Sequence, residues 1–281
     1  MLVGLVVVIA AVIGGFIMAG GELMVLLQPS EFIVIGGAAI GSLIVSTPVK
    51  VIKLGLTQIK GVLGGATPAE EYASLLAMLY QVFKQVQQAG VMSLEAHFED
   101  PAKSTILEKY PKFLARHEAV DFLADSVKVL IVGGIAAHDL EALMDEDLKA
   151  HHDEALKPAS ALTKIGDALP GLGIVAAVLG IVITMKSIDG DAAVIGEHIA
   201  GALVGTFLGI LLSYGFIGPL SAAMEARVST DGRAFECVKV GLLANLRGYN
   251  PMVSVEFARK SLQTTSRPSF QDLEAHLKSA R

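Results

Sequence analysis

Thr206 is the polar residue best placed to do chemistry in the apolar part of this sequence. It stands inside the uncharged stretch 199–224. A hydroxyl there most often donates to its own helix backbone, but it can also line a path for ions or water. Pro170 and Pro219 flank this region, and each proline removes a backbone N–H and can create a kink or hinge, although membrane helices tolerate proline freely. These residues predict either ordinary helices or an ion path beside a hinge.

Small residues recur on the same stretch at helical spacing. Gly201, Gly205 and Gly209 follow one another every four residues, and a similar set of small residues occupies 173–180. Such a stripe lets a neighbouring helix backbone approach closely, which is the common use of this pattern in membranes. The alternative is a smooth face that surrounds another helix which must turn or shift. The spacing alone is compatible with both.

The elements that must position these residues are four stretches without a charge. They cover residues 1–21, 32–49, 168–185 and 199–224. A helix needs about 20 apolar residues to cross a bilayer, so each stretch is long enough to span it. None of the four contains an acid or a base, whereas a transporter with its own site normally carries an ionisable group inside the membrane. We therefore expect four transmembrane helices without an ionisable group of their own.

The stretches divide the chain into four segments. Residues 1–49 and 168–224 form two transmembrane hairpins, and 50–167 and 225–281 form soluble segments. The soluble segments contain 12 and 9 of the 22 lysines and arginines, whereas the hairpin connections contain only Lys186. Basic residues near span ends favour the cytoplasm. Both termini and the long middle segment are therefore predicted to be cytoplasmic.

The soluble segments are predicted to be helical. Apolar residues repeat at helical spacing over 68–88, 120–131 and 140–148, a short helix is expected at 270–278, and strand signals are scarce. The predicted fold class is all-α, a polytopic membrane protein with four transmembrane helices and a helical cytoplasmic domain.

Other kinds of chemistry find little support in the residues. The single cysteine, Cys237, excludes an intrachain disulfide and offers no metal-site spacing. We expect it to react with a thiol reagent only when the membrane is breached. The adjacent pair His151–His152 is expected at the surface without a metal. No nucleotide-binding loop, catalytic constellation or basic stripe for nucleic acid occurs, so neither an enzyme nor a cofactor is predicted.

Several stretches together resemble the MotA family of flagellar stator subunits, which are proton-channel proteins. The matching sequences lie in the same order and on the expected spans, so the resemblance is specific and runs almost end to end. They are 28–45 (QPSEFIVIGGAAIGSLIV), 92–101 (MSLEAHFEDP), 141–148 (EALMDEDL), 167–182 (DALPGLGIVAAVLGIV), 201–220 (GALVGTFLGILLSYGFIGPL) and 267–270 (RPSF).

The resemblance implies an ion-driven motor subunit in the bacterial inner membrane. Members of this family form a ring, thought to contain five copies, around two copies of a MotB-like partner with one span and an essential intramembrane aspartate. Ion passage moves the ring, and the cytoplasmic segment acts on the rotor protein FliG. The family's two functional prolines fall on Pro170 and Pro219, and its hydroxyl near the ion path falls on Thr206. The partner would then supply the ionisable group.

The family's rotor contact transfers less completely. An arginine and a glutamate eight residues apart interact with the rotor in the family, and these positions are Gln87 and Glu95 here. Lys84, one helical turn before Gln87, can supply the missing positive charge. Arg116 or the acidic cluster 145–147 are the alternatives.

Two other function classes compete with a stator subunit. An energiser of envelope proteins similar to ExbB or TolQ shares the design of the last two spans but typically has three spans, and the first hairpin and the 267–270 sequence favour the stator. A transporter or enzyme with its own site lacks the required groups. Sodium-driven relatives carry a threonine where this chain has Ala177, and with Thr206 as one hydroxyl the site is too poor in oxygen for sodium. A proton is therefore the expected coupling ion.

Overall fold

The computed structural model describes residues 1–64, 69–187 and 191–279, and within these ranges all regular structure is helical. The chain forms two compact units, Met1–Gly65 with Ala155–Arg227 and Ala66–Glu154 with Val228–Arg281. Two long helices, α9 (Ala137–Thr184) and α11 (Gly218–Leu246), contribute residues to both. The predicted all-helical fold class is confirmed.

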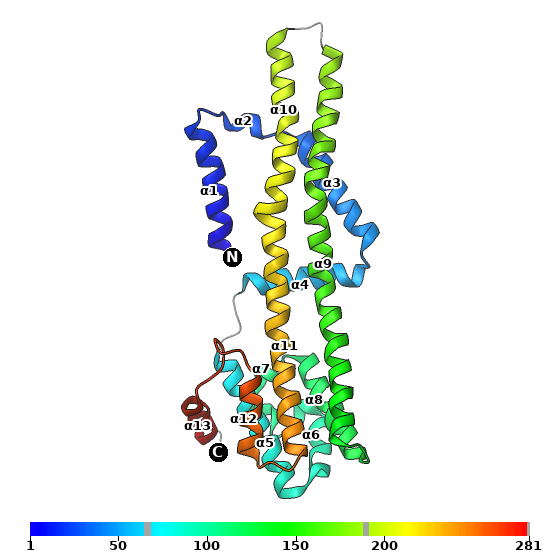
Figure 1. The fold of residues 1–281 in the computed structure, drawn as a ribbon, viewed down its shortest axis with the longest axis vertical. Helices are drawn as coiled ribbons and strands as arrows, with labels where there is room; N and C mark the ends of the chain where they lie inside the picture. The colour runs from blue at the N-terminus through cyan, green and yellow to red at the C-terminus, as the bar shows by residue number, and fades with distance from the viewer. Residues whose placement is uncertain (65–68, 188–190, 280–281) are drawn as a thin grey trace. The chain divides into compact units, whose positions relative to one another are not determined.

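The first unit contains the apolar helices (Figure 1). Besides its parts of α9 and α11, its elements are α1 (Leu2–Met18), α2 (Leu23–Leu26), α3 (Pro29–Ser46), α4 (Val49–Leu63), η4 (Met185–Ser187), α10 (Ala192–Ile210) and η5 (Leu211–Ile217).

Three helical stretches among the described residues are long and apolar enough to cross a membrane. They are Leu23–Ser46, Ala137–Thr184 and Ala192–Leu246, and a shorter apolar helix covers Leu2–Met18. The first of these three takes in Glu31, because α3 begins at Pro29 and not at residue 32. The expectation that no span carries an ionisable group was therefore wrong for this helix.

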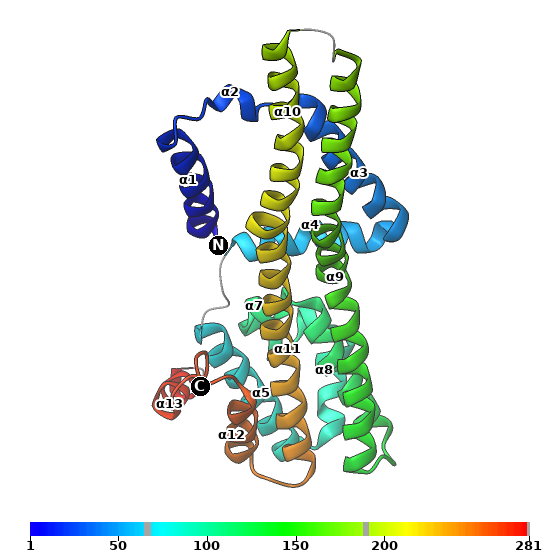
Figure 2. The same ribbon diagram turned by 45° about the horizontal axis from the view of Figure 1, so that its top comes forward.

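The boundaries of the two units differ from the segment boundaries expected from the sequence. α4 belongs to the first unit, although it follows residue 49, and α9 continues without a break through residue 167. Figures 1 and 2 show α4 running across α9. The crossing is close because Gly55 faces Pro158, where a methyl on Gly55 would lie 3.3 Å from the proline Cβ, and Gln58 Nε2 donates to the Ala155 carbonyl at 2.8 Å.

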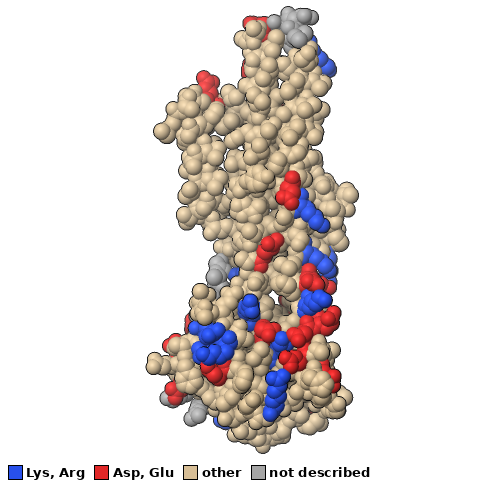
Figure 3. Space-filling model, in the orientation of Figure 1, with Lys and Arg blue, Asp and Glu red and all other residues tan. Residues whose placement is uncertain are grey.

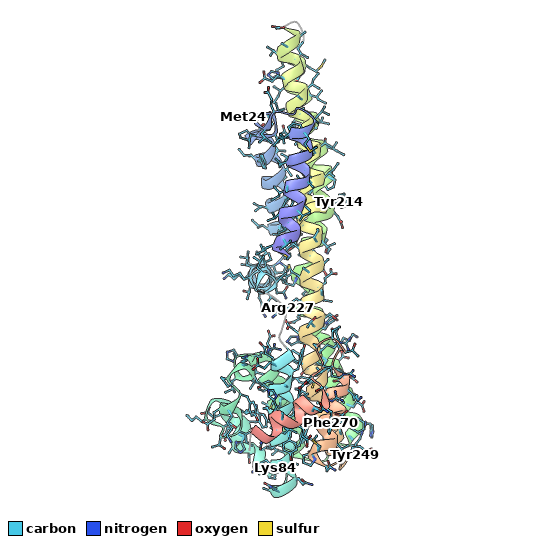
Figure 4. All side chains as sticks on the ribbon, turned by 90° about the vertical axis from the view of Figure 1, so that its left-hand side faces the viewer. Met24, Lys84, Tyr214, Arg227, Tyr249 and Phe270 are labelled. Carbon is cyan, nitrogen blue, oxygen red and sulfur yellow. The ribbon has the colours of Figure 1, made fainter. Side chains whose placement is uncertain are left out.

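The first unit buries little of its apolar surface. Its core is a small cluster in which Ile35, Leu169 and Leu208 meet from α3, α9 and α10. Large apolar side chains elsewhere face outward, and Tyr214 on η5 is 73% exposed and points away from the helices in Figure 4. Figure 3 shows a broad part of the face of this unit without charged side chains. Exposed apolar surface of this extent is typical of helices that contact lipid or a partner protein.

The second unit has a conventional hydrophobic core. Its elements, besides the remaining parts of α9 and α11, are α5 (Ala69–Ala89), η1 (Val91–Leu94), α6 (Glu95–Glu99), η2 (Pro101–Lys103), η3 (Leu107–Lys109), α7 (Pro111–Leu114), α8 (His117–Val132), α12 (Pro251–Ser261) and α13 (Phe270–Ser279). Phe83 of α5 is fully buried beside Gly241 and Ala258. Phe122 and Phe235 pack edge to face with ring centroids 5.6 Å apart.

Two expectations for this unit need correction. Cys237 is fully buried on the face of α11 that helps to form the core, so a reagent cannot reach it in the folded unit even when the membrane is open. Burial raises the pKa of its thiol, which further lowers its reactivity. His151 is only half-exposed, because its ring packs against Phe235 and its Nε2 lies 3.1 Å from Glu118 Oε2. His152 is exposed, as expected.

Residues 267–270 form hydrogen bonds that hold the C-terminal part of the chain. Arg267 donates to the carbonyls of Leu262 and Lys260, and buried Arg259 donates to the Pro268 carbonyl at 2.9 Å. Arg259 also holds Glu256 with two bonds of 2.7 Å, and these hydrogen bonds lower the pKa of Glu256. These hydrogen bonds hold the turn between α12 and α13 in place.

Candidate functional site: the seam between α9 and α10

The small residues of α9 and α10 bring the two antiparallel backbones into direct contact. A methyl group built on Gly209 would lie 2.5 Å from the Leu169 carbonyl oxygen and 2.9 Å from Gly173 Cα. One built on Gly173 would lie 2.7 Å from the Gly205 carbonyl oxygen. Real Cβ atoms do not approach so closely, so only glycine fits at these positions. We call this contact, formed by residues 169–180 of α9 and 201–209 of α10, the glycine seam.

Ala177 and Thr206 both belong to the glycine seam. Ala177 is 7% exposed, and its amide nitrogen would lie 3.3 Å from a methyl on Gly205. Thr206, the next residue, is half-buried, and its hydroxyl makes no hydrogen bond within the described ranges. Thr163 and Thr184 show the common alternative, because each donates to the carbonyl four residues earlier in its own helix. The Thr206 hydroxyl is thus left open for another partner.

The two prolines have different effects on their helices. Pro170 lies inside α9, which continues through it as it does through Pro158. Pro219 stands in the first turn of α11, directly after the π-helix η5, where the Gly218 N–H donates to the Ser213 carbonyl five residues back. A proline ring collides with the carbonyl four residues before it, and a widened turn relieves that collision. The sequence predicted a kink or hinge at Pro219, but it did not predict the π-helix before it.

The prolines lie at neighbouring levels of the helix pair. Gly166, one turn before Pro170, faces Ile217 and Gly218, and a methyl on it would lie 3.1 Å from Ile217 Cγ2. One turn further along the pair, Ser221 Oγ lies 2.5 Å from the Thr163 hydroxyl oxygen and 2.9 Å from the Ala159 carbonyl oxygen, and its single proton is donated to one of the two. Polar contacts therefore join α9 and α11 on the side of the prolines away from Thr206.

Glu31 is the residue that sequence reasoning missed. Its side chain reaches from α3 onto the glycine seam, where a methyl on Gly205 would overlap its Oε2 and one on Gly180 would lie 3.8 Å from its Oε1. The residue is 7% exposed, and Oε2 has no hydrogen-bond partner among the described residues. The signal in the sequence was its position: Glu31 comes three residues after Gln28 and directly before the uncharged stretch.

The expected rotor residues lie on several elements of the second unit. Gln87 and Glu95 are exposed, on α5 and at the start of α6, and Lys84 on α5 is half-exposed (Figure 4). Arg116 instead lies 2.7 Å from Glu71 and ties the segment before α8 to α5. Its guanidinium is thus already paired within the subunit.

Only part of the acidic cluster 145–147 is paired within the subunit. Asp145 lies 2.7 Å from Lys239 Nζ on α11, and Glu236 lies 3.0 Å from the same nitrogen. Burial acts against the charge of Lys239, but the hydrogen bonds that it donates to Asp145 and Glu236 outweigh this effect and raise its pKa. Glu146 and Asp147 are exposed. Asp145 is exposed as well, but of the three acids only Glu146 and Asp147 have no ion pair within the described residues.

Two family models match most of the chain. A model described as motility protein A N-terminal matches residues 2–90, and the model of the MotA/TolQ/ExbB proton channel family matches residues 115–236. The chain is similar to solved MotAB structures from C. jejuni (TM-score 0.76, 19% identity, 96% of this chain and 98% of that one) and Bacillus subtilis (TM-score 0.70, 22% identity, 100% and 99%). These likenesses support the fold.

The chain is also similar in sequence to curated relatives over its whole length. The chain is 44% identical to motility protein A of Salmonella typhimurium and 43% identical to that of Escherichia coli, in both cases over 100% of this chain and 95% of the relative. Chemotaxis protein PomA of Vibrio alginolyticus is 24% identical over 95% of this chain and 96% of its own. The chain therefore belongs to the motility protein A branch of the MotA/TolQ/ExbB proton channel family.

Proposed function

We propose that this protein is a stator subunit of the bacterial flagellar motor, which couples proton flow across the inner membrane to torque on the rotor. The observation that carries the proposal is the 44% identity with a motility protein A over the whole chain. The role is ion conduction and mechanical work, so we assign no catalytic residue. The energiser function of ExbB and TolQ is the alternative, and the match of residues 2–90 to a motility-specific model argues against it.

The subunit works as part of an assembly. We propose four spans with both termini in the cytoplasm, a homo-oligomeric ring of five copies, and a MotB-like single-span partner with an intramembrane aspartate. Two observations support a partner: the solved relatives are MotAB complexes, and the first unit leaves large apolar side chains exposed. Membrane lipid covers the remaining apolar surface, and the second unit faces the rotor protein FliG.

The glycine seam supplies the ion-path residues. We assign Thr206 and Ala177 to the path, and Pro170 and Pro219 to the movement that follows ion passage. The open hydroxyl of Thr206 and the π-helix before Pro219 support these roles. A proton needs only a chain of waters and an acceptor, whereas a hard cation needs several oxygen ligands, which Ala177 cannot contribute. We therefore propose a proton as the coupling ion.

The rotor contact is assigned to exposed charge on the second unit. We propose that Glu95 and Lys84 carry it, with Gln87 between them in sequence, because Arg116 is held by Glu71. Glu146 and Asp147 form the alternative contact. Exposed pairs contribute only about 0–1 kcal/mol each, so several residues must share the contact.

Proton uptake into membrane vesicles tests the proposed function. Vesicles that contain this chain together with its single-span partner are expected to take up protons when a potential is imposed. Vesicles with this chain alone, or with the partner's intramembrane aspartate changed to asparagine, should not. Uptake by the chain alone at the rate of the pair would contradict the proposal.

A further inference from the structure

Glu31 is the one acidic side chain in the described part of the apolar helices that is buried. It lies in the first turn of α3 and is 7% exposed. Its carboxyl group rests on the glycine seam between Gly205 of α10 and Gly180 of α9, with Ala176 also beside the Gly205 position. Oε2 is unpartnered within the described residues. Oε2 of this carboxyl group is therefore enclosed by backbone and methyl groups.

Glycines 201 and 205 make the room for polar side chains of α3. Gln28, one turn before Glu31, lies over Gly201, where a methyl would be 3.2 Å from its Nε2. The Gln28 amide makes one hydrogen bond, because its Nε2 donates to the Val25 carbonyl at 3.2 Å. Glu31 has no such bond at Gly205. The seam thus encloses one bonded and one unbonded polar group, which close helix packing alone does not require.

The surroundings of Glu31 favour a bound proton. An ionised carboxylate without a partner is very costly in apolar surroundings, whereas the protonated acid carries no charge. The other titratable groups described at this end of the surrounding elements are Glu22 before α2, Lys186 after α9, Asp191 before α10, and Glu197 and His198 on α10, and all five are exposed. None of them is buried beside Glu31, so none of them neutralises the charge of an ionised Glu31.

We propose that Glu31 is a second proton-binding site of the membrane unit, in addition to the partner's aspartate. Gly205, over which the carboxyl group lies, directly precedes Thr206, so the bound proton is next to the proposed ion path. Glu31 Oε2 takes a proton from hydrated protons at the end of the span where α3 begins, and returns it to water or hydroxyl groups on the path. The assignment of this role in conduction rests on the proposed function.

Labelling with a hydrophobic carbodiimide tests the site directly. The reagent dicyclohexylcarbodiimide reacts with protonated carboxyl groups inside membranes, and mass spectrometry locates the adduct. In the complex of this chain with its partner, Glu31 is expected to be labelled and exposed Glu22 is not. Absence of the adduct on Glu31, under conditions that label the partner's aspartate, would overturn the proposal. This experiment needs no variant.

Proton uptake by variants tests the role in conduction. E31Q keeps the size of the side chain but cannot take up a proton, and E31D keeps the acid in a shorter side chain. We expect E31Q to lose most of the uptake, E31D to keep a larger share, and the matched control E22Q to keep all of it. If E31Q conducts as well as the unaltered complex, or better than E31D, the carboxyl group serves packing only and the proposal is wrong. If the unaltered complex takes up no protons while Glu31 is labelled, the proposed function fails and the proton site stands.

Discussion

Adding a single methyl group at Gly209 tests the glycine seam. The methyl in G209A would lie 2.5 Å from the Leu169 carbonyl oxygen, about 0.9 Å short of the 3.4 Å at which ordinary contact begins. The atom it meets is backbone, so no side chain can rotate away, and α9 and α10 must separate. Overpacking of this kind typically destabilises by about 1–3 kcal/mol.

A matched control separates the clash from the helix propensity of alanine. Gly196 lies in the same helix and has nothing within 4 Å of a methyl, so G196A should stabilise by about 1 kcal/mol, the usual gain of alanine over glycine inside a helix. Because both variants gain this helix propensity, they are expected to differ by the cost of the clash, about 1–3 kcal/mol in unfolding free energy.

Unfolding of the purified complex, followed by circular dichroism in denaturing detergent, measures this difference. The reasoning is refuted if G209A is as stable as G196A, because the backbones would then not be in contact. A second readout is proton uptake, which should fall in G209A and stay unchanged in G196A.

Four further predictions concern the second unit. Changing Lys239 to Met removes its bond to Asp145 and should destabilise the unit by about 1–3 kcal/mol, as measured by chemical denaturation, and a loss below 0.5 kcal/mol would contradict it. Because the pKa of Lys239 is raised above 10.5, the stability from this pair should be complete at neutral pH and lost only as the pH rises through that higher value; a loss near pH 8 would argue against it. The buried thiol of Cys237 should react with a maleimide only when the unit opens, and faster in K239M; fast labelling of the native complex would be inconsistent with its burial. Reversal of Glu95 to Lys should slow swimming modestly and the added reversal of Lys84 should slow it further, and unchanged speed in the double variant would move the rotor contact to Glu146 and Asp147.

Composition and spacing were sufficient to predict the helical fold and the membrane helices. Long uncharged stretches have few alternatives to a membrane helix, and small residues every four positions specify close packing wherever the helix lies. The contact of Gly205 and Gly209 with α9 follows from such a pattern. Pro170 could also be placed near the start of a helix, because the uncharged stretch begins at residue 168 and continues after it.

Features that depend on tertiary contacts could not be predicted in this way. Glu31 directly precedes the uncharged stretch 32–49, and nothing in the local sequence shows that α10 has a glycine where its carboxyl group lies. The pairing of Arg116 with Glu71 joins residues 45 positions apart. The π-helix before Pro219 depends on how the widened turn packs, which a proline alone does not specify.

Restoration of motility tests the central claim most directly. A strain that lacks its own motility protein A is given this chain with its single-span partner, and the speed of tethered or swimming cells is measured at fixed proton-motive force over a range of sodium concentrations. We expect rotation to return, at a speed that follows the proton-motive force and does not change with sodium. A strain that assembles the complex but does not rotate would contradict the stator function, and a speed that rises and saturates with sodium would contradict the proton as its coupling ion.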